Sequence, residues 1–255
     1  KFGKEIKKVS KIKDKLLINF KDNTNDLVDF IAVSDGVFSK TKSVIENKTI
    51  QPIYNGSIAI RTVLKNLPEF NYDKNNISLV MLKNAHIVIY PINKKGELNV
   101  VCIIRQKLSN NIDLKLLIKK EILLQNKNLE NLFENQLEYW PIYTSKKPSK
   151  SIYENLFYIG DAFYTFPPTM AQGASQSIEA ANELFNLLSK DNKNTADLFF
   201  KKRLERTKVI NRRSKLNHHI FHFSNPILKM IRNESLKIML KSKIFLDNYI
   251  GKVYK

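Results

Sequence analysis

An acidic side chain stands where its chemistry would suit a ligand. Asp161 follows Gly160 at the end of the apolar run NLFYIG (155–160), which is typical of a short buried strand. The carboxylate is therefore expected just beyond the carboxyl end of a strand, where open α/β sheets bind their ligands. Because an ionised aspartate only accepts hydrogen bonds, it suits ligand hydroxyls such as those of a ribityl or ribose chain.

The residues that follow predict a rigid turn and then a helix that begins at a glycine. Pro167 and Pro168 stiffen the turn and remove two backbone donors, and Gln172-Gly173 opens the helical pattern. The first turn of a helix has free N–H groups and a partial positive charge, and a glycine there allows close approach. Strand, aspartate, turn and helix together predict a cradle for a polyhydroxylated, negatively polarised cofactor. A turn followed by an ordinary capped helix is the structural alternative.

The stretch YIGDAFYTFPPTMAQGASQSIEAA (158–181) resembles the second flavin-binding motif of the FAD-dependent aromatic-ring monooxygenases, which share the p-hydroxybenzoate hydroxylase fold. The resemblance implies that Asp161 contacts the ribityl chain of FAD and that Gly173 and Ala174 approach the pyrimidine edge of the flavin. It also places Pro168 beside both the cofactor and the substrate. The residues that match the motif are Gly160, Asp161, Ala162, Pro168, Gln172, Gly173 and Glu179.

The sequence departs from that motif at two places. Phe163-Tyr164 stand where the family usually has Ala-His, and Ala180 stands where it has Asp. Both departures lie next to matched residues, so they concern the immediate surroundings of the cofactor and not the fold.

A second motif resembles the Asp-Gly motif of the same family, A-D-G-x-x-S-x-x-R. In DFIAVSDGVFSKTK (29–42) the matching residues are Asp35, Gly36 and Ser39, while Lys42 replaces the usual Arg and loses its bidentate fork. The resemblance assigns Asp35 and Gly36 to the binding of FAD and of a reduced nicotinamide cofactor. A simple turn at the end of a hairpin is the structural alternative.

Two strand-like segments carry candidate substrate residues. His86 and Tyr90 lie four apart in NAHIVIY (84–90), so both point to one face of a strand, roughly 13 Å apart with Val88 between them. An apolar face with a polar group at each end suits an aromatic substrate, and His86 could remove a phenolic proton. The segment resembles A-H-x-x-x-Y-P of salicylate-hydroxylase-like members, which implies catalytic and substrate-binding roles for both residues.

Arg61 is a third candidate substrate residue. It lies in YNGSIAIRTVL (54–64), which resembles the family's Y-x-G-x-x-A-x-R, and it could bind an anionic group of the substrate. Structural roles remain the alternatives for these residues: a hydrogen-bonded histidine, a core tyrosine and a surface ion pair.

The elements that position these residues follow from the hydrophobic periodicity. A hairpin is expected within 9–33 and an antiparallel sheet from strands at 57–63, 84–90 and 97–104, followed by helical segments at 112–139 and a connector at 139–150. A helix is expected at 174–189, and two or three basic helices at 195–248 with a break near Asn225-Pro226. The predicted buried face of the first of these helices consists of Ala174, Ile178, Ala181, Phe185 and Leu188.

The expected fold class is α/β (α+β), with three parts. Residues 1–45 and 151–200 form an incomplete FAD-binding, Rossmann-like domain, 46–150 an antiparallel-sheet substrate domain, and 201–255 the C-terminal basic helices. The family begins with a βαβ unit that carries G-x-G-x-x-G, and no such motif occurs here. We therefore expect that the chain is a fragment of a longer protein and that the pyrophosphate of FAD is bound elsewhere.

The charge and composition of the chain bear on which classes of partner it could bind. The net charge is +19, and residues 201–255 carry 15 Lys and Arg against 3 Asp and Glu. A compositional bias toward Lys explains this without a partner, although the C-terminal region is also a candidate for peripheral membrane contact. No aromatic-interleaved or zinc-spaced motif favours nucleic acid, and His218, His219 and His222 are interpreted as packing or surface residues and not metal ligands.

Cysteine usage and hydropathy bear on the compartment. Cys102 is the single cysteine, which excludes an internal disulfide and predicts a small buried side chain. No apolar run approaches the ~18–20 residues that cross a bilayer, and no signal-peptide pattern is present. These features favour a cytoplasmic setting.

The family resemblance implies an activity. We expect an FAD-dependent monooxygenase that takes electrons from NADH or NADPH, reacts with molecular oxygen through a flavin C4a-hydroperoxide, and hydroxylates an aromatic, phenolic acid-like substrate. A quinone-precursor hydroxylase or an epoxidase-type flavoprotein is the alternative enzyme. A non-catalytic remnant or a basic interaction module is the alternative outside enzymes.

Overall fold

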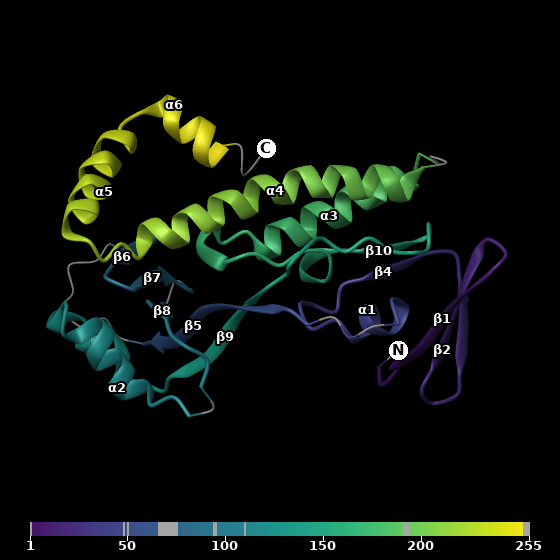
Figure 1. Cartoon of the computed structure of the whole chain (residues 1–255), viewed down its shortest axis with the longest axis horizontal. Helices are drawn as coiled ribbons and strands as arrows, with labels where there is room; N and C mark the ends of the chain where they lie inside the picture. The colour runs from purple at the N-terminus through teal and green to yellow at the C-terminus, as the bar shows by residue number, and fades with distance from the viewer. Residues whose placement is uncertain are drawn as a thin grey trace. The chain divides into compact units, whose positions relative to one another are not determined.

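The computed structural model describes residues 2–47, 49, 51–65, 76–93, 96–109, 111–190 and 194–251. Their contacts divide the chain into two units. Figure 1 shows the helices and strands of both. Unit 1 comprises Lys1–Ile53 and Tyr143–Lys215, and unit 2 comprises Tyr54–Ile142 and Leu216–Lys255. The mixed class of helices and sheets predicted from the sequence is confirmed.

Unit 1 contains two small sheets. Strands β1 (Ile6–Ile12), β2 (Lys15–Phe20) and β3 (Asn25–Val28) form an antiparallel meander, whereas β4 (Ile31–Val33) pairs in parallel with β10 (Leu156–Tyr158). The predicted hairpin within 9–33 is confirmed where β2 pairs antiparallel with β3. Its second strand ends at Val28, however, because residues 31–33 pair with β10 in the other sheet.

The division of that segment has a packing reason. Ile31 and Val33 are buried and join a core with Leu156 and Tyr158 of β10, while Phe30 immediately before them is exposed. The chain leaves the meander at 29–30 so that this alternating pair can face the core beneath β10. Since β-rich residues continue without a turn signal, the sequence pattern alone favoured one uninterrupted strand.

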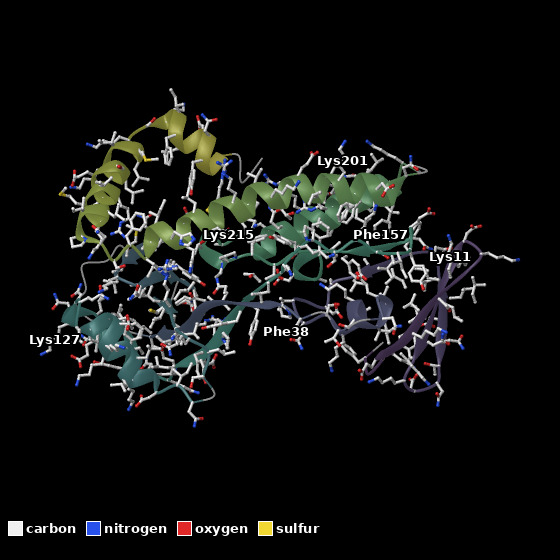
Figure 2. All side chains as sticks on the ribbon, viewed as in Figure 1. Lys11, Phe38, Lys127, Phe157, Lys201 and Lys215 are labelled. Atoms are coloured by element: carbon white, nitrogen blue, oxygen red, sulfur yellow. The ribbon has the colours of Figure 1, made fainter. Side chains whose placement is uncertain are left out.

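The helices of unit 1 are α1 (Lys40–Ile45), α3 (Gly173–Leu188) and the first part of α4 (Thr195–Phe221). Figure 1 shows α3 running beside this part of α4. Phe157 of β10, which is labelled in Figure 2, lies in a core with α3 residues and with Phe199, and the centroids of the two phenyl rings are 5.7 Å apart. This core fixes α3 directly after the turn that contains the candidate aspartate.

The buried face of α3 differs from the predicted face. The predicted members Ile178 and Phe185 are 71% and 68% exposed, respectively. Both faces have residues at helical spacing, so periodicity does not choose between them. The face that packs against the Phe157 and Phe199 rings is the one that the structure buries, and it consists of Gln176, Ala180, Leu184 and Leu187.

Unit 2 is built on a five-stranded sheet in the order β6-β7-β8-β5-β9. Its strands are β5 (Ile53–Leu64), β6 (Ser78–Met81), β7 (Ala85–Pro91), β8 (Leu98–Arg105) and β9 (Glu138–Thr144). The pairs β5/β8, β6/β7 and β7/β8 are antiparallel, which confirms the three strands predicted from the sequence.

One face of this sheet is closed by a helical layer. It consists of α2 (Leu114–Ile118), a π-helical turn (Lys119–Leu123) and a 3-10 helix (Lys127–Phe133), where Figure 2 labels Lys127. Buried side chains from this layer, including Ile122 and Leu129, pack on the aliphatic side chains of β5, β7 and β8. Cys102 is fully buried in the same core, as predicted.

Strand β9 corrects the prediction of a connector at 139–150. Pro141 suggested irregular structure, but Glu138–Thr144 forms the last strand of the sheet beside β5. An edge strand tolerates proline because one of its sides needs no ladder hydrogen bonds.

The C-terminal helices follow the predicted pattern. After α4 come α5 (Pro226–Met239), α6 (Lys243–Leu246) and a π-helical turn (Asp247–Gly251). Asn225 caps α5, since its side-chain oxygen accepts from the backbone N–H of Ile227 and Leu228, which explains the predicted break. Within the described ranges, no helix combines the length and apolar character needed to cross a bilayer.

The observed buried face of α3 predicts a large loss of stability at one residue and almost none at its neighbour. Leu184→Ala should lower the free energy of unfolding by about 2–5 kcal/mol, because it opens a cavity against the Phe157 core. Phe185→Ala is the matched control and should change it by less than about 0.5 kcal/mol, because the ring is exposed. Urea denaturation measures both values, and an equal loss in the two variants would contradict the observed face.

Candidate functional site

The turn that carries Asp161 favours glycine at the position before it. Gly160 has a φ of +57°, and a Cβ atom at this position would lie 2.6 Å from Oγ of Ser177. The 3-10 turn Gly160–Ala162 therefore lies so close to α3 that a side chain at position 160 would force Ser177 to shift. The result places Asp161 beside the start of α3, as the sequence predicted.

The start of α3 is open to a ligand. Gln172 occupies the N-cap position without a side-chain cap hydrogen bond, and the first turn contains no acidic residue. A Cβ built on Gly173 meets no heavy atom within 4 Å, and Gly173 and Ala174 are both exposed. The first N–H groups of the helix are thus available to acceptor atoms, and the helix dipole favours a negatively polarised group there.

A small cleft in unit 1 joins these two features. Asp161 is exposed on its open side, while partial burial by the surrounding protein raises the pKa of its carboxyl above the usual value. The cleft is small, about 10 Å³, so a flavin ring does not fit inside it. Its lining includes an acceptor carboxylate and two glycines, which suits a ligand hydroxyl that donates a hydrogen bond to Asp161. The residues that line the cleft are Gly160, Asp161, Phe163, Tyr164, Phe166, Gly173, Gln176, Ala180, Arg203 and Thr207.

Pro168 and Gln172, which are predicted cofactor residues, lie outside that lining, and so does Ala174. Pro168 is exposed at the start of a 3-10 turn, Pro168–Met170, and Ala171 follows it in the left-handed region with a φ of +51°. Gln172 is buried, and its Oε1 accepts a hydrogen bond from Nε2 of Gln176 at 3.3 Å. In this structure both residues shape the entry into α3, and their contacts with a ligand stay predictions.

The Asp-Gly motif forms the entry into α1. Oδ2 of Asp35 accepts from the backbone N–H of Thr41 at 3.1 Å, and Oγ of Ser39 accepts from that of Lys42 at 3.0 Å. Gly36 has a φ of +85°, which favours glycine at this turn. Asp35 thereby orders the start of α1, and its contact with a cofactor stays a prediction.

Lys42 connects the two motifs. Its side chain is buried, and Nζ donates a hydrogen bond to the backbone oxygen of Ala162 at 3.0 Å. Burial lowers the pKa of the Lys42 ammonium below its usual value. The lysine therefore holds the turn next to Asp161 with a single donor, at a position where the family resemblance expects an arginine.

Arg203 is a structural residue of this site that the sequence reasoning missed. Its buried guanidinium donates to Oε1 of Glu179 at 2.8 Å and to Oε1 of Gln176 at 2.7 Å, and Arg206 donates to Glu179 as well. Burial alone would raise the pKa of Glu179, but hydrogen bonds from Arg206 and Arg203 lower it below the usual value. The available signal was an Arg-x-x-Arg spacing on a basic helix, which by itself indicates only a charged face.

In unit 2 the strand register brings the predicted substrate residues onto one face of the sheet. Ala59, Ile103 and His86 form one row across β5, β8 and β7, and Arg61, Val101 and Val88 form the next row. The third row is Val63, Asn99 and Tyr90. This is the face opposite the helical layer, because its neighbours in sequence point into the core beneath α2.

Burial divides this face into two parts. His86 is buried, whereas Val88, Val101 and Tyr90 are half-buried and Arg61 is exposed. Nε of Arg61 donates to Oδ1 of Asn99 at 2.5 Å. The partly open end thus combines aliphatic side chains with a tyrosine and a guanidinium, the combination expected for an aromatic ligand with a polar substituent.

His86 belongs to a cluster of buried imidazoles. Its Nδ1 lies 2.6 Å from Nε2 of His222, and the centroid of the His222 ring is 4.6 Å from that of His218. Nε2 of His218 lies 3.4 Å from Oγ of Ser57. His222 was missed as a partner of His86, since 136 residues separate the two in sequence.

The cluster stays uncharged at neutral pH. Burial, and then the nearby His218, lower the pKa of His86 to about 3. Burial together with neighbouring histidines and Arg105 lowers the pKa of His218 to about 4 and that of His222 to about 2. Among the described residues, no group of three or more His, Cys, Asp or Glu side chains is arranged to hold a metal ion.

Comparison with protein families identifies relatives. The sequence profile of the squalene epoxidase family matches residues 28–251. A search of curated protein sequences finds no match.

Solved structures share the fold at low sequence identity. HpxO from Klebsiella pneumoniae, complexed with FAD and uric acid, is 15% identical with a TM-score of 0.81, covering 92% of this chain and 62% of its own. A salicylate hydroxylase substrate complex is 16% identical with a TM-score of 0.78, covering 97% of this chain and 67% of its own. The p-nitrophenol 4-monooxygenase PnpA from Pseudomonas putida is 14% identical with a TM-score of 0.74. This match covers 98% of the present chain and 66% of the PnpA chain.

These matches confirm the predicted resemblance to FAD-dependent aromatic-ring monooxygenases. At such identities the similarity to the solved structures establishes the fold. The chain spans about 62% of the length of the HpxO chain.

The histidine cluster predicts acid lability of unit 2. These imidazoles are neutral in the folded protein and titrate near pH 6.5 when unfolded, so acid favours the unfolded chain. Stability should be highest above pH 6.5 and fall as the pH drops toward 4, by up to about 1.4 kcal/mol per pH unit for each histidine. Urea denaturation followed by the fluorescence of Trp140, the single tryptophan, measures this slope.

Matched variants separate the cluster from other titrating groups. His222→Phe removes one buried imidazole and should flatten the slope between pH 6.5 and 4. His219→Gln at the exposed neighbouring position should change the slope much less, because His219 is only the smallest of the charges that act on His218 and His222. A slope that is identical in wild type and His222→Phe would contradict the assignment.

Proposed function

This chain belongs to the squalene epoxidase family, and from that premise we propose that the protein is an FAD-dependent monooxygenase that hydroxylates a small aromatic substrate. The overall reaction would consume the substrate, O₂, NADH or NADPH and a proton, and would yield the hydroxylated product, the oxidised nicotinamide and water. The structural neighbours include HpxO complexed with FAD and uric acid and a salicylate hydroxylase with its substrate.

One observation carries the assignment of FAD. Helix α3 begins at Gly173 with uncapped N–H groups and open space in front of them, directly beside the carboxylate of Asp161. In this arrangement Asp161 would accept hydrogen bonds from the ribityl hydroxyls. The first N–H groups of α3 would meet the electron-rich edge of the flavin ring.

The bound flavin would accept electrons from the nicotinamide and activate oxygen, which no side chain can do. The residues of this chain would hold the flavin by fixing the Asp161 turn and the start of α3 in place. Gly160 permits the close approach of the Asp161 turn to α3, and Lys42 fixes that turn through the oxygen of Ala162. Arg203 fixes α3 through Glu179.

The open end of the sheet face in unit 2 is the proposed substrate surface. Val88 and Val101 offer an apolar floor, and Arg61 offers a cation at its border. Tyr90 lies in the neighbouring row and His86 in the row on the other side. This pattern supports a flat aromatic substrate that carries a polar or anionic substituent.

The proposed role of His86 is hydrogen bonding to a substrate hydroxyl. If Nδ1 of His86 donates its proton to Nε2 of His222, then Nε2 of His86 is an acceptor. Its pKa of about 3 makes the imidazole a weak base, so it would orient a phenolic hydroxyl and polarise it but would not hold the proton as a stable cation. His222 would act as the positioning residue that sets this tautomer.

Substitution of Asp161 tests the flavin assignment. Asp161→Ala in the full-length protein should weaken FAD binding by roughly tenfold or more, since a hydrogen bond to a charged group contributes about 1.5–3 kcal/mol. The bound FAD per chain is measured by absorbance after gel filtration, and substrate-stimulated NAD(P)H oxidation is measured across a panel of aromatic acids.

The control is Asp197→Ala, which removes an exposed carboxylate paired with Lys150 in the same unit and should leave FAD content unchanged. Full FAD content in Asp161→Ala would refute the role of this aspartate. A wild-type protein that takes up no FAD would refute both enzyme assignments and leave the non-catalytic alternative.

A second candidate is a flavoprotein hydroxylase or epoxidase that acts on a hydrophobic substrate held in a membrane. The observation in its favour is the surface of α5 and α6, where large apolar residues are exposed between lysines at 229, 237, 241 and 243. A basic helix with exposed apolar residues suits an anionic lipid surface. The exposed apolar residues are Ile227, Leu228, Met230, Ile231, Ile238, Leu240 and Ile244.

Vesicle binding tests this second candidate. The full-length protein should sediment with vesicles that contain phosphatidylserine and much less with phosphatidylcholine alone, and Ile227→Asn/Ile231→Asn should reduce binding about tenfold or more through lost apolar burial. Ile178→Asn replaces an equally exposed isoleucine on α3 and should bind as the wild type does. Absence of sedimentation with either vesicle would reject the candidate.

A further inference from the structure

On the proposed substrate face, the buried side-chain amide of Asn99 has a hydrogen-bond partner for its oxygen but none for its NH₂ group. Asn99 lies in β8 between Val63 of β5 and Tyr90 of β7, and its side chain is 0% exposed. Oδ1 accepts a hydrogen bond from Nε of Arg61 at 2.5 Å. Nδ2 is buried and has no hydrogen-bond partner.

The orientation of this amide follows from its neighbour. Arg61 is only a donor, so the oxygen of the Asn99 amide must face it and the NH₂ group must point elsewhere. A rotated amide would bring two donors together. Leaving a buried donor without an acceptor destabilises a protein, and native structures contain few such groups. An acceptor that arrives with a ligand would satisfy it.

The surroundings define the chemistry of that acceptor. Arg61 and the NH₂ group of Asn99 offer only donors, one of them charged, and Val101 and Val88 continue the same face with aliphatic surface. A carboxylate is an acceptor-only group that matches a guanidinium and an amide together. An aromatic ring bearing the carboxylate would cover the two valines.

We propose that Arg61 and Asn99 form a donor pair that selects substrates with a carboxylate on an aromatic ring, with Asn99 as the specificity-determining residue. This inference rests on the proposed function, because it assigns the substrate class of the same face. Arg61 is exposed and meets the carboxylate first. Its long side chain then shifts, and one carboxylate oxygen reaches Nδ2 of Asn99.

The proposal is tested by binding of a matched series of ligands to the full-length holoenzyme. Isothermal titration calorimetry would compare benzoate, benzamide and benzyl alcohol, which share the ring and differ in the charge and the acceptor of the substituent. The wild type should bind benzoate at least tenfold more tightly than benzyl alcohol. Benzamide, a neutral acceptor that also carries donors, should lie between them.

Two substitutions at one position separate the donor from the shape of the side chain. Asn99→Asp keeps the shape, replaces the NH₂ group by a second acceptor and should lower benzoate affinity at least tenfold. Asn99→Leu removes the amide and should lower benzoate affinity similarly while benzyl alcohol affinity changes less than threefold. Asn128→Asp makes the same chemical change at an exposed position of unit 2 and should bind all three ligands as the wild type does.

A double-mutant cycle tests whether the two donors act together. Arg61→Gln and Asn99→Asp should each weaken benzoate binding, and the combined variant should lose less than the product of the two factors, because both contact one carboxylate. Equal benzoate affinity in Asn99→Asp and Asn128→Asp would overturn the proposal. Folding of each variant is checked by its thermal unfolding, and Asn99→Leu supplies the answer if the aspartate does not fold.

The outcomes distinguish this inference from the proposed function. FAD content and NAD(P)H oxidation are measured on the same preparations. A yellow, NAD(P)H-oxidising protein that does not prefer benzoate would reject the carboxylate assignment and leave the monooxygenase standing. A colourless protein that binds benzoate through Asn99 would reject the monooxygenase and retain the binding site.

Discussion

One buried guanidinium holds the flavin-side elements of unit 1 together. Arg203 of α4 is almost fully buried and donates to Glu179 and Gln176, both on the first half of α3. Removing the Glu179 carboxylate would leave the buried guanidinium with only the longer ion pair to Glu183, which is destabilising. Because α3 is fixed in this way, its first turn can lie within contact distance of the glycine turn that precedes Asp161. The open helix start and the carboxylate therefore keep their relation without any ligand.

In unit 2, the pairing register of the strands determines which side chains face the core and which face the proposed substrate surface. A shift of β8 by one residue would turn Asn99 and Val101 into the aliphatic core and bring Val100 and Cys102 to the opposite face. The core beneath α2 contains side chains from β5, β7 and β8, so such a shift would remove the apolar side chains of β8 from that core and expose them on the other face. Hydrophobic burial on one face thus determines which polar groups meet on the other.

The sequence predicted the elements better than their partners. Strands at 57–63, 84–90 and 97–104, the helix at 174–189 and the break at Asn225 follow from local periodicity and capping, and the structure confirms them. Three predictions failed: the extension of the hairpin to residues 31–33, the connector at 139–150 and the buried face of α3. Each was decided by a partner distant in sequence, namely β10, β5 and the Phe157 ring. His222 beside His86 and Ala162 beside Lys42 escaped detection for the same reason. Long-range contacts carry no local pattern.

Hydrogen-bond satisfaction separates structural polar residues from those that await a ligand. Lys42 and Gln176 are buried, and each makes hydrogen bonds that join two segments of unit 1, so both are explained by the fold itself. Asn99 is buried to the same degree, yet its single contact leaves the NH₂ group unmatched. An apolar residue of similar volume would fill its position in the sheet without that penalty. Under the proposed recognition of a carboxylate, the amide supplies a donor to the ligand on the face that Arg61 borders.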